Sequence, residues 1–520
     1  MKKLYTILFI ASISLSASAQ LVYKDVAAIF YNRCTSCHHQ NGGAPFSMMN
    51  YSETYPWVSQ IKTDLNIGKM PPWPPDTTYT RLLHERIITT TEKANIISWI
   101  NGGAPSGDTT QAPAAPVYTK YHLYGTPDLI LKIPAFASNA SSSDAYNCFA
   151  LPTGLTQDRI LRAFEITPSN PAIVHHVVTK IDTTGTVATD VSGGCFSEPG
   201  QLGVGGYAPG APPSVYPSSS VLKLGMRIKA GSKIIMQMHY PTGSAGQIDS
   251  TEIRLYFYPT SITGIRPVYS TTFLQNWTMS IPANTVKTYT AKYPSSGTLT
   301  VPYSIFASSP HAHKVNTSML VYAYRATPVD TIPLIKIPHW DFNWQGMYVH
   351  PNMVKVPAGY LLGSKHVYDN TTNNLNNPNN PPQLVTAGTS TTNEMLFDAF
   401  EWTYYQTGDE NIDIGSILAN DSLLNPNSTS SVNGISKTQI TSYVFPNPVN
   451  ESATLIVMNA PAGKCELHIF DLYGKEVAMD VKQTSDSFTI RRGNLPAGTY
   501  LYSLRWNNYT GSGKIIMSNK

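Results

Sequence analysis

The sequence has few charged residues. Asp, Glu, Lys and Arg make up 13% of its 520 residues, about half of the roughly 25% in an average globular protein. The hydrophobic fraction of 42% is ordinary. This combination excludes a disordered chain and a coiled coil, because both need more charge. The formal net charge is +4 and Lys and Arg form no runs, so the chain lacks the concentrated positive field that binds nucleic acid.

Long apolar segments are also scarce. Residues 2–19 contain two lysines, an apolar stretch and the small-residue pattern Ala17-Ser18-Ala19. This pattern is typical of a secretory signal peptide, here residues 1–19, that is cleaved after Ala19. No later run approaches the roughly 18 apolar residues of a membrane-spanning helix. We therefore expect an exported chain without a transmembrane segment.

Cysteine is rare, with five in the chain. Cys34 and Cys37 belong to a motif described below. In the oxidising compartment that an exported chain reaches, Cys148 and Cys195 could pair as a disulfide, which would leave Cys465 as a lone thiol.

Glycine and proline are plentiful, with 35 and 39 residues, which favours short strands and turns. The exception is residues 20–105, where helical spacing predominates. There Thr89 and Glu92 form a capping box before an Ile-rich helix that Gly102 would end. We predict a small α domain over residues 20–105, followed by a Pro-containing linker over residues 106–117.

The remaining sequence is predicted to be mainly β. Residues 252–257 alternate with a period of two, as in a half-buried strand, and turn signals recur between such runs. We expect two β domains, residues 118–265 and 266–408. A linker over residues 409–442 and a β module over residues 443–520 would follow.

Residues 34–38, Cys-Thr-Ser-Cys-His, carry the attachment signature of c-type haem. Its two thiols bond to the haem vinyl groups, and His38 ligates the iron. A thioredoxin-like dithiol would need a βαβ context, which the helical pattern does not provide. For the sixth ligand we choose Met70, on a Pro-stiffened loop. Met48 and Met49 are nearer alternatives that we expect to pack against the ring. The segment resembles small bacterial cytochromes c.

Five histidines stand in three local groups. His311 and His313 have a spacing that places both imidazoles on one face of a strand, which makes a two-point metal site. His175 and His176 are adjacent, so both could ligate one metal only at a twisted strand end. His239 ends an apolar strand, where a single histidine is usually a satisfied core or surface residue.

These histidines occur in the order and rough spacing of a known family. Together with Thr392-Asn393-Glu394-Met395, Asp144-Ala145-Tyr146-Asn147-Cys148 and His339-Trp340-Asp341-Phe342-Asn343, they resemble the copper type II, ascorbate-dependent monooxygenases, the group of peptidylglycine α-hydroxylating and dopamine β-monooxygenases. The resemblance spans about residues 144–402. It implies two jelly-roll-like β sandwiches with one copper ion on each.

The resemblance also implies a role for each ligand. His175, His176 and His239 would hold an electron-transfer copper, and His311, His313 and Met395 would be the catalytic ligands of the copper that binds dioxygen. A thioether favours Cu(I), whereas a zinc hydrolase, the alternative for three histidines, has little use for one.

The family's substrate contacts differ here. Where the peptide-amidating members have Arg, Asn and Tyr, this chain has Ser309, Phe397 and Ala399. With no cation at these positions, we expect a more apolar substrate than a peptide carboxylate.

The C-terminal module has a resemblance of its own. Its motifs are Val444-Phe445-Pro446-Asn447-Pro448, Asp471-Leu472-Tyr473-Gly474-Lys475-Glu476-Val477 and Leu495-Pro496-Ala497-Gly498-Thr499-Tyr500. They resemble the type IX secretion sorting domain of Bacteroidetes, a small β sandwich. The resemblance implies contact with the type IX machinery and a location at the cell surface or in the medium. An Ig-like adhesion module is the alternative.

The sequence therefore predicts a multidomain, mainly β protein: an all-α cytochrome c domain, two jelly-roll-like sandwiches and a C-terminal Ig-like sandwich. Its expected cofactors are two copper ions and haem c. We expect a secreted monooxygenase that hydroxylates a C–H bond of a small-molecule substrate with O2, using electrons from an external donor that pass through the haem. The alternative is a surface electron-transfer protein without oxygenase activity.

Overall fold

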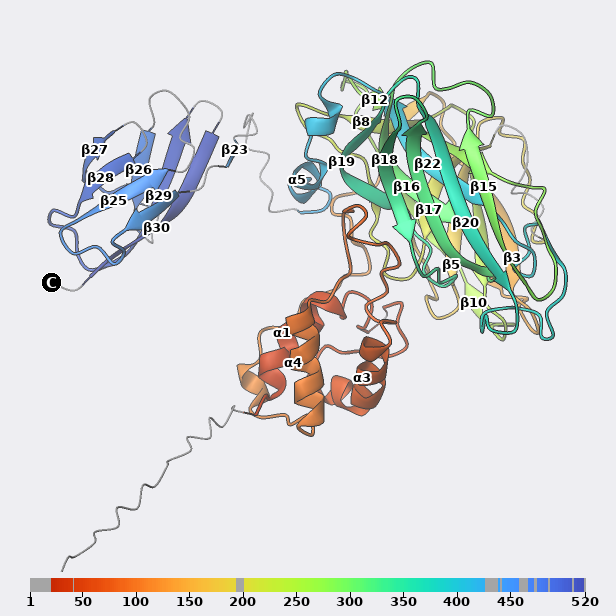
Figure 1. Ribbon diagram of the computed structural model, residues 1–520, viewed down its shortest axis with the longest axis horizontal. Coiled ribbons are helices and arrows are strands. Elements are labelled where there is room, and N and C mark those ends of the chain that lie inside the picture. The colour runs from red at the N-terminus through yellow and green to blue at the C-terminus, as the bar shows by residue number, and fades with distance from the viewer. Residues whose placement is uncertain are drawn as a thin grey trace, which may run out of the picture. The chain divides into compact units, whose positions relative to one another are not determined.

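The computed structural model describes residues 20–40, 42–192, 201–425, 438–439, 442–457, 466–471, 475–484, 487–506 and 509–518. The chain divides into two compact units, Met1–Ser428 and Thr429–Lys520. The first contains a small helical region and two sets of β-sheets, and the second contains further sheets (Figure 1). The protein is therefore a mainly β, multidomain protein with a small N-terminal helical region.

The helical region precedes every sheet. Its elements are α1 (Tyr23–Arg33), α2 (Tyr51–Thr54), η1 (Tyr55–Trp57), α3 (Val58–Asn66), α4 (Thr90–Asn101) and η2 (Thr109–Gln111). The predicted capping box is confirmed, because the side chains of Thr89 and Glu92 each accept a hydrogen bond from the backbone N–H of the other. The helices pack around Phe30 and Trp99, whose rings meet edge to face at 5.8 Å.

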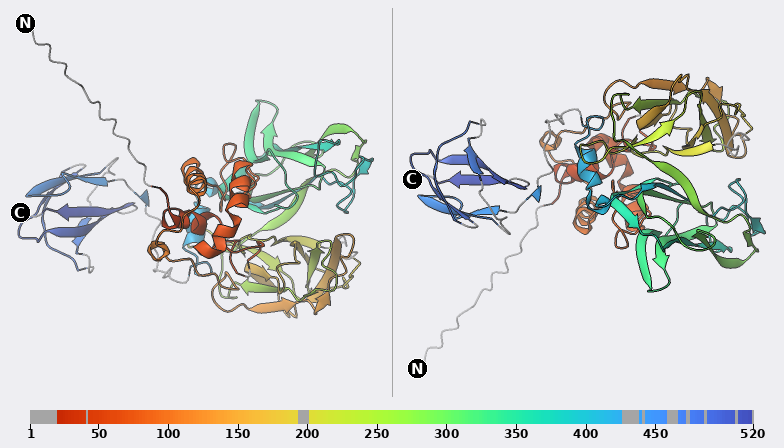
Figure 2. Two further views of the ribbon diagram at one scale, coloured as in Figure 1. Left: turned by 90° about the horizontal axis from the view of Figure 1, so that it is seen from below. Right: turned by 90° about the horizontal axis from the view of Figure 1, so that it is seen from above.

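Two sheets form the first sandwich, seen from two sides in Figure 2. One has the order β1-β11-β4-β8-β12 with β7 beside β4, and the other has the order β3-β9-β5-β6. The strands are β1 (Leu129–Lys132), β3 (Ala145–Pro152), β4 (Arg159–Thr167), β5 (His176–Asp182), β6 (Gln201–Tyr207), β7 (Ser214–Val215), β8 (Leu224–Ile228), β9 (Lys233–Tyr240), β11 (Glu252–Phe257) and β12 (Arg266–Pro267), with the small pair β2 (Phe136–Ala137) and β10 (Ile248–Asp249).

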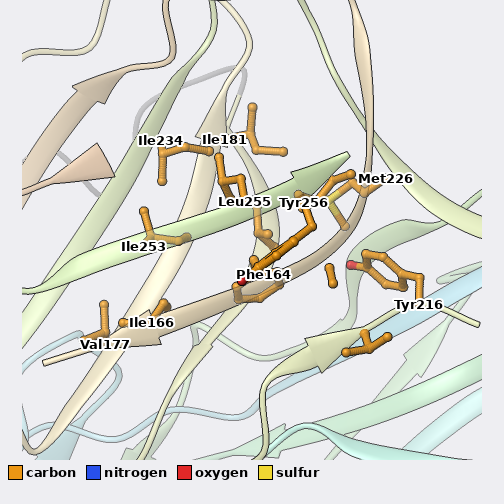
Figure 3. Packing of buried hydrophobic residues seen from close by; sticks show 14 of the residues in the cluster. Phe164, Ile166, Val177, Ile181, Tyr216, Met226, Ile234, Ile253, Leu255 and Tyr256 are labelled. Atoms are coloured by element: carbon orange, nitrogen blue, oxygen red, sulfur yellow. The ribbon is translucent and has the colours of Figure 1, made fainter. Parts of the chain in front are cut away.

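The core of this sandwich lies between its two sheets. Ile253 and Leu255 of β11 face Ile234 of β9, and all three are fully buried (Figure 3). The predicted strand over residues 252–257 is confirmed, since its alternate residues point into this core. Full burial of one such side chain stabilises the fold by roughly 1.5–3 kcal/mol. On β9 the core residues are even-numbered, so His239 faces the opposite side of its sheet.

The second sandwich has two four-stranded sheets, with the orders β13-β22-β16-β19 and β15-β20-β17-β18. They share one hydrophobic core that includes Phe400, Tyr368 and Val321. The strands are β13 (Tyr269–Gln275), β15 (Thr285–Tyr293), β16 (Tyr303–His311), β17 (Asn316–Arg325), β18 (Asp330–Ile337), β19 (Tyr348–Val356), β20 (Leu361–Asn370) and β22 (Phe397–Tyr404), with the small pair β14 (Ser280–Ile281) and β21 (Val385–Thr386).

The two sandwiches meet slightly later in the chain than residue 265. Strand β12 pairs in parallel with Leu224 and Gly225 of β8, and Val268 is buried in the first core. Strand β13 of the second sandwich begins at Tyr269. Pairing with β8 thus keeps residues 266–268 in the first sandwich.

The predicted linker over residues 409–442 begins too early. Residues 409–425 include η4 (Asp409–Asn411) and α5 (Ile414–Ala419). Ile414 and Leu418, one helical turn apart, are buried in the first core. The buried Asp409 carboxylate pairs with Arg266 at 2.6 Å. Apolar burial and this ion pair therefore hold residues 409–425 in the first unit, while residues 426–437 lie outside the described residues.

Residues 69–88, the connecting arm between α3 and α4, lie across both sandwiches. Leu82 is buried in the second core, and its neighbour Leu83 packs against the first. The Asp76 carboxylate pairs with Lys336 of β18 at 2.8 Å. The helical region is thus fastened to both sandwiches within the first unit.

The second unit is a smaller two-sheet structure. Its strands are β23 (Thr438–Gln439), β24 (Ser442–Phe445), β25 (Ser452–Val457), β26 (Glu466–Phe470), β27 (Asp480–Gln483), β28 (Ser487–Arg491), β29 (Gly498–Trp506) and β30 (Tyr509–Met517). The orders are β23-β30-β29-β26 and β24-β25-β28-β27. Leu455, Ile490 and Ile515 lie fully buried in its core.

Across all described residues, the helices are too short or too polar to span a membrane.

Candidate metal centres

Three histidines of the first sandwich converge. His239 is the cross-strand partner of His176, and His175 directly precedes β5. The Nδ1 atom of His176 lies 3.1 Å from that of His175 and 3.2 Å from that of His239. Three nitrogens bound tetrahedrally to one ion at 2.0–2.1 Å would lie about 3.3 Å apart. His175, His176 and His239 could therefore hold a metal ion.

Neighbouring groups fix which nitrogen of each ring is available. His239 Nε2 lies 3.1 Å from Asp144 Oδ2, and His175 Nε2 lies 3.4 Å from Asn343 Oδ1. An oxygen that accepts the Nε2 hydrogen leaves the lone pair of a neutral ring on Nδ1. The hydrogen bond to His239 also holds the pKa of Asp144 below its usual range. The Nδ1 lone pairs of His175 and His239 thus face His176.

Burial keeps the imidazoles of His175 and His176 neutral. It lowers the pKa of His175 and lowers that of His176 further, and the neighbouring histidines add to both shifts. The ring of Tyr146 stacks on His239 at 4.5 Å. Since a protonated imidazole cannot ligate, the low pKa values suit a metal site at neutral pH.

A second group lies at the end of β16. His311 is the last residue of that strand, and His313 lies beyond it. Their ring centroids are 5.3 Å apart. His311 Nδ1 donates to Gln345 Oε1 at 2.7 Å and His313 Nδ1 donates to Asn393 O at 3.1 Å, so each Nε2 keeps its lone pair. Burial lowers the pKa of His311 to about 4 and that of His313 to about 3.

Glu394 joins this group to Met395. The same carboxylate oxygen of Glu394 accepts the backbone N–H of His313 at 2.8 Å and that of Met395 at 3.1 Å. Its other oxygen accepts from Val315 at 2.7 Å. The Met395 carbonyl in turn accepts from the Tyr368 hydroxyl at 2.7 Å. One fully buried carboxylate thus brings the backbones of His313 and Met395 together.

Phe342 lies between the two histidine groups. Its ring centroid is 6.2 Å from that of His175 and 5.9 Å from that of His313. The next residue, Asn343, contacts His175 as described above. Residues 339–343 of the second sandwich therefore contact the metal-binding face of the first.

Ser309, Phe397 and Ala399 lie beside His311 or on the strand paired with it. Ser309 and Ala399 are cross-strand partners, as are His311 and Phe397. The Ser309 hydroxyl donates to Gly346 O at 3.0 Å. The Phe397 ring lies 6.5 Å from both His311 and the half-exposed Trp277. The surroundings of His311 on this side are therefore apolar and aromatic.

The Cys-x-x-Cys-His motif follows α1. His38 Nδ1 lies 3.1 Å from Phe46 O, which directs the Nε2 lone pair away from the backbone. Cys34 and Cys37 are free thiols, and burial raises the pKa of Cys34 to about 12. The Cys37 Sγ would lie 2.1 Å from a Cβ placed on Gly210, a glycine with φ of 73°, so only glycine permits this approach.

The motif is close to the loop after β6. Arg86 of the connecting arm donates to Gly210 O at 2.8 Å. Strand β6 ends at Tyr207, which pairs with Val177, the neighbour of His176. The loop that the cysteine motif approaches is therefore joined through β6 to β5, the strand that begins with His176.

Two further predictions concern single residues. Met48 is buried in the helical core, while Met70 is partly exposed and its backbone N–H bonds to Asp64 O. The packing of Met48 against a haem ring and the role of Met70 as a haem ligand stay predictions. Cys148 is disulfide-bonded. Its predicted partner Cys195 lies outside the described residues, as does Cys465.

A comparison with known protein families found a match at the C-terminal end of the chain. Residues 443–518 match the model of the secretion system C-terminal sorting domain. The C-terminal module is a type IX sorting domain. The sorting domain directs the protein to secretion or to attachment at the cell surface through the type IX system. No model of a copper monooxygenase or cytochrome c family matches the chain.

A search of curated proteins found no sequence match. Among solved structures, the BSP domain of a biofilm-associated protein is 9% identical, with 78% of this chain and 84% of that chain covered and a TM-score of 0.17. A VP2 subviral particle of infectious bursal disease virus is 9% identical, with 57% and 76% covered and a TM-score of 0.17. The titin I-band fragment I67–I69 is 6% identical, with 70% and 99% covered and a TM-score of 0.14. Scores this low carry no argument about this chain.

Sequence reasoning missed the residues that orient the ligands. Asp144 and Glu394 lie in the quoted motifs, but their hydrogen bonds to His239 and His313 span 95 and 81 positions. Gln345 and Phe342 likewise act across long separations. The one local signal for these orienting contacts was Glu394, a carboxylate directly before the proposed ligand Met395.

Proposed function

We propose that this chain is an exported copper-dependent monooxygenase. The reaction converts a substrate C–H bond, O2, two electrons and two protons into a C–OH group and one water. The arrangement that carries the proposal is two groups of oriented imidazoles, one on each of the two sandwiches, with Met395 tied to the second group through Glu394.

Each group suits copper. Copper held there would cycle between two oxidation states and, at a site with a thioether, bind dioxygen as Cu(I). His175, His176 and His239 would hold one ion, and His311, His313 and Met395 the other. The oxygens of Asp144, Gln345 and Asn393 fix the ring tautomers, which conserves the ligand geometry through turnover.

The chain also offers a place for the substrate. Phe397 and Trp277 present aromatic surface beside His311, and the small pair Ser309 and Ala399 leaves no charge there. We infer an uncharged, partly apolar reacting group. It would contact the aromatic rings while its C–H bond faces the second histidine group.

Haem c fits the helical region. Cys34 and Cys37 would attach it, with His38 and Met70 as axial ligands, and it would supply single electrons. The chain's own contribution is docking: the connecting arm holds the motif against the loop that follows β6. The short path from Tyr207 through Val177 to His176 supports electron delivery to the three-histidine group.

A surface electron-transfer protein without oxygenase activity is the second candidate. The observation that favours it is the pairing of Ser309 with Ala399. Neither residue carries a charge, and the Ser309 hydroxyl already donates to Gly346 O, so the pair has no obvious means of gripping a charged substrate.

Dioxygen uptake tests the proposal. The purified mature chain, loaded with copper and supplied with a reductant, is assayed against a panel of small aromatic and aliphatic substrates. We expect uptake that matches hydroxylated product. Met395→Leu should suppress turnover while preserving the fold, since the two side chains have similar volumes. Met319→Leu, in the core of the same sandwich, is the matched control.

Two results would count against the proposal. Full turnover by Met395→Leu would mean that Met395 only packs. No uptake across the panel, together with copper-dependent oxidation of the haem, would favour the electron-transfer protein.

A further inference from the structure

A cavity of about 340 Å³ adjoins Phe342, on the side of the second sandwich. Its wall consists of residues 340–343, residues 375–378, Lys314 and Asn316. Roughly 300–1,000 Å³ is the usual volume of a small-molecule site. Because Phe342 and Lys314 both adjoin His313, a ligand in this cavity would lie next to the second histidine group.

Asn316 places a buried polar group in this wall. The residue is 3% exposed, and its side-chain oxygen has no hydrogen-bond partner among the described residues. The neighbouring Tyr368 hydroxyl interacts with the Asn316 amide but donates its own hydrogen to Met395 O, so it cannot also donate to the Asn316 oxygen. Buried amide oxygens are normally paired, so Asn316 indicates a ligand that can donate a hydrogen bond.

Lys314 supplies a positive charge. Its Nζ lies 5.9 Å from the Phe342 ring centroid. None of the ion pairs found among the described residues engages Lys314. The nearby Asp341 carboxylate is occupied in part, because its Oδ1 accepts from the backbone and the amide of Asn343 at 2.9 Å. The ammonium of Lys314 therefore remains available to an anion.

The opposite wall is a loop that internal hydrogen bonds hold in one shape. The Asn370 amide donates to Ile281 O and Gln383 O, at 2.9 and 2.7 Å, which ties the two ends of the loop together. Asn377 in turn donates to Asn370 Oδ1 at 2.9 Å. These bonds give the Asn-rich segment, residues 370–382, a defined shape in which Asn376 and Asn377 line the cavity. The Asn377 side chain is engaged within the loop, because its oxygen also accepts from the Asn379 backbone.

We propose that this cavity binds a small hydroxycarboxylate. The carboxylate would pair with Lys314, the hydroxyl groups would donate to the Asn316 oxygen and bond to Asn376, and the carbon chain would lie on Phe342. Binding itself does not depend on the proposed function. The role of the ligand does rest on it: a hydroxycarboxylate beside both histidine groups would be either the substrate of the monooxygenase or its reductant.

Calorimetry on the purified full-length mature chain tests binding, with D-gluconate as the probe. We expect gluconate to bind, and Lys314→Met to weaken it at least about tenfold, since a charge-assisted hydrogen bond is lost. Sorbitol lacks the carboxylate and so cannot pair with Lys314. Its affinity for the unaltered protein should therefore be about as low as the affinity of gluconate for Lys314→Met. The control is Lys365→Met, an exposed lysine of β20, which should bind gluconate normally. Asn316→Ser should also weaken binding.

Absence of gluconate binding, or equal affinity in Lys314→Met and the unaltered protein, would overturn the proposal. The two roles are separated on the copper-loaded protein. Oxygen uptake with hydroxylation of gluconate identifies a substrate site. Displacement of gluconate by ascorbate, together with slower ascorbate oxidation in Lys314→Met, identifies a reductant site. If gluconate binds as expected and no oxygenase activity exists, the proposed function fails while the binding site stands.

Discussion

Replacing Glu401 with Gln should remove a pH dependence of stability that arises where the two sandwiches meet. Glu401 of β22 is 4% exposed, and the buried Tyr216 of the first sandwich donates to its carboxylate at 3.1 Å. Burial raises the pKa of Glu401 from 4.5 to about 7, although the hydrogen bond from Tyr216 opposes the shift. The Tyr216 hydroxyl stays protonated throughout, because burial raises its pKa well above 10.

The sign follows from proton binding. Below pH 4.5 Glu401 is protonated in both the folded and the unfolded chain. Between pH 4.5 and 7 the unfolded chain releases this proton while the folded chain keeps it, so stability falls as the pH rises and then levels off above pH 7. At about 1.4 kcal/mol per pKa unit, the loss amounts to about 3 kcal/mol.

Urea unfolding at pH 5, 6, 7 and 8 gives the free energy of unfolding of the unaltered chain and of Glu401→Gln. The difference between the two free energies at each pH measures the effect of Glu401. The variant should gain about 3 kcal/mol of unfolding free energy relative to the unaltered chain across this range. Tyr216→Phe is the companion variant: without the hydroxyl, the pKa of Glu401 should rise further, and the loss of stability should extend above pH 7. Parallel pH profiles for the unaltered chain and Glu401→Gln would refute the reasoning.

Three other predictions concern the cofactors and the cellular location of the protein. The purified mature chain should hold two copper ions and one covalent haem, and His313→Ala should lose one copper and keep the haem by metal analysis and absorbance; zinc in place of copper would contradict the ligand assignment. With the haem reduced beforehand and ascorbate absent, stopped-flow addition of dioxygen and substrate should oxidise the haem at the turnover rate, and His176→Ala should slow this oxidation; a haem that stays reduced during turnover would be a spectator. Deleting residues 443–520, the sorting domain, should leave cofactor binding intact and retain the protein in the periplasm, as fractionation would reveal; surface display of the shortened chain would contradict this.

Local signals in the sequence predicted local structure well. The Thr89 and Glu92 capping box and the alternation of residues 252–257 both reappear as expected, because each depends on contacts within a few residues. The sorting domain was recognisable for a related reason, since its motifs are short and continuous.

Long-range contacts explain what the sequence did not reveal. The linker was predicted from a tract rich in Ser, Thr and Asn that begins near residue 420, yet the Asp421 carboxylate pairs with Arg162 at 2.7 Å, across 259 positions. The apolar pair Ile414 and Leu418 behind Asp413, a helix cap, was the overlooked local clue. The contact of Phe342 with His175 and His313 had no local signal, since it exists only once two sandwiches face each other.

The connecting arm has a consequence for how this protein can be taken apart. Leu82 is buried in the core of the second sandwich, and its neighbour Leu83 packs against the core of the first. Cutting away the helical region to express the sandwiches alone would leave a leucine-sized hole in the second core, which would cost about 3–5 kcal/mol if it failed to collapse, and would expose apolar surface on the first. The connecting arm is thus part of the structure of both sandwiches. Shortened or chimeric proteins should therefore keep residues 69–88 with the sandwiches and not with the helices.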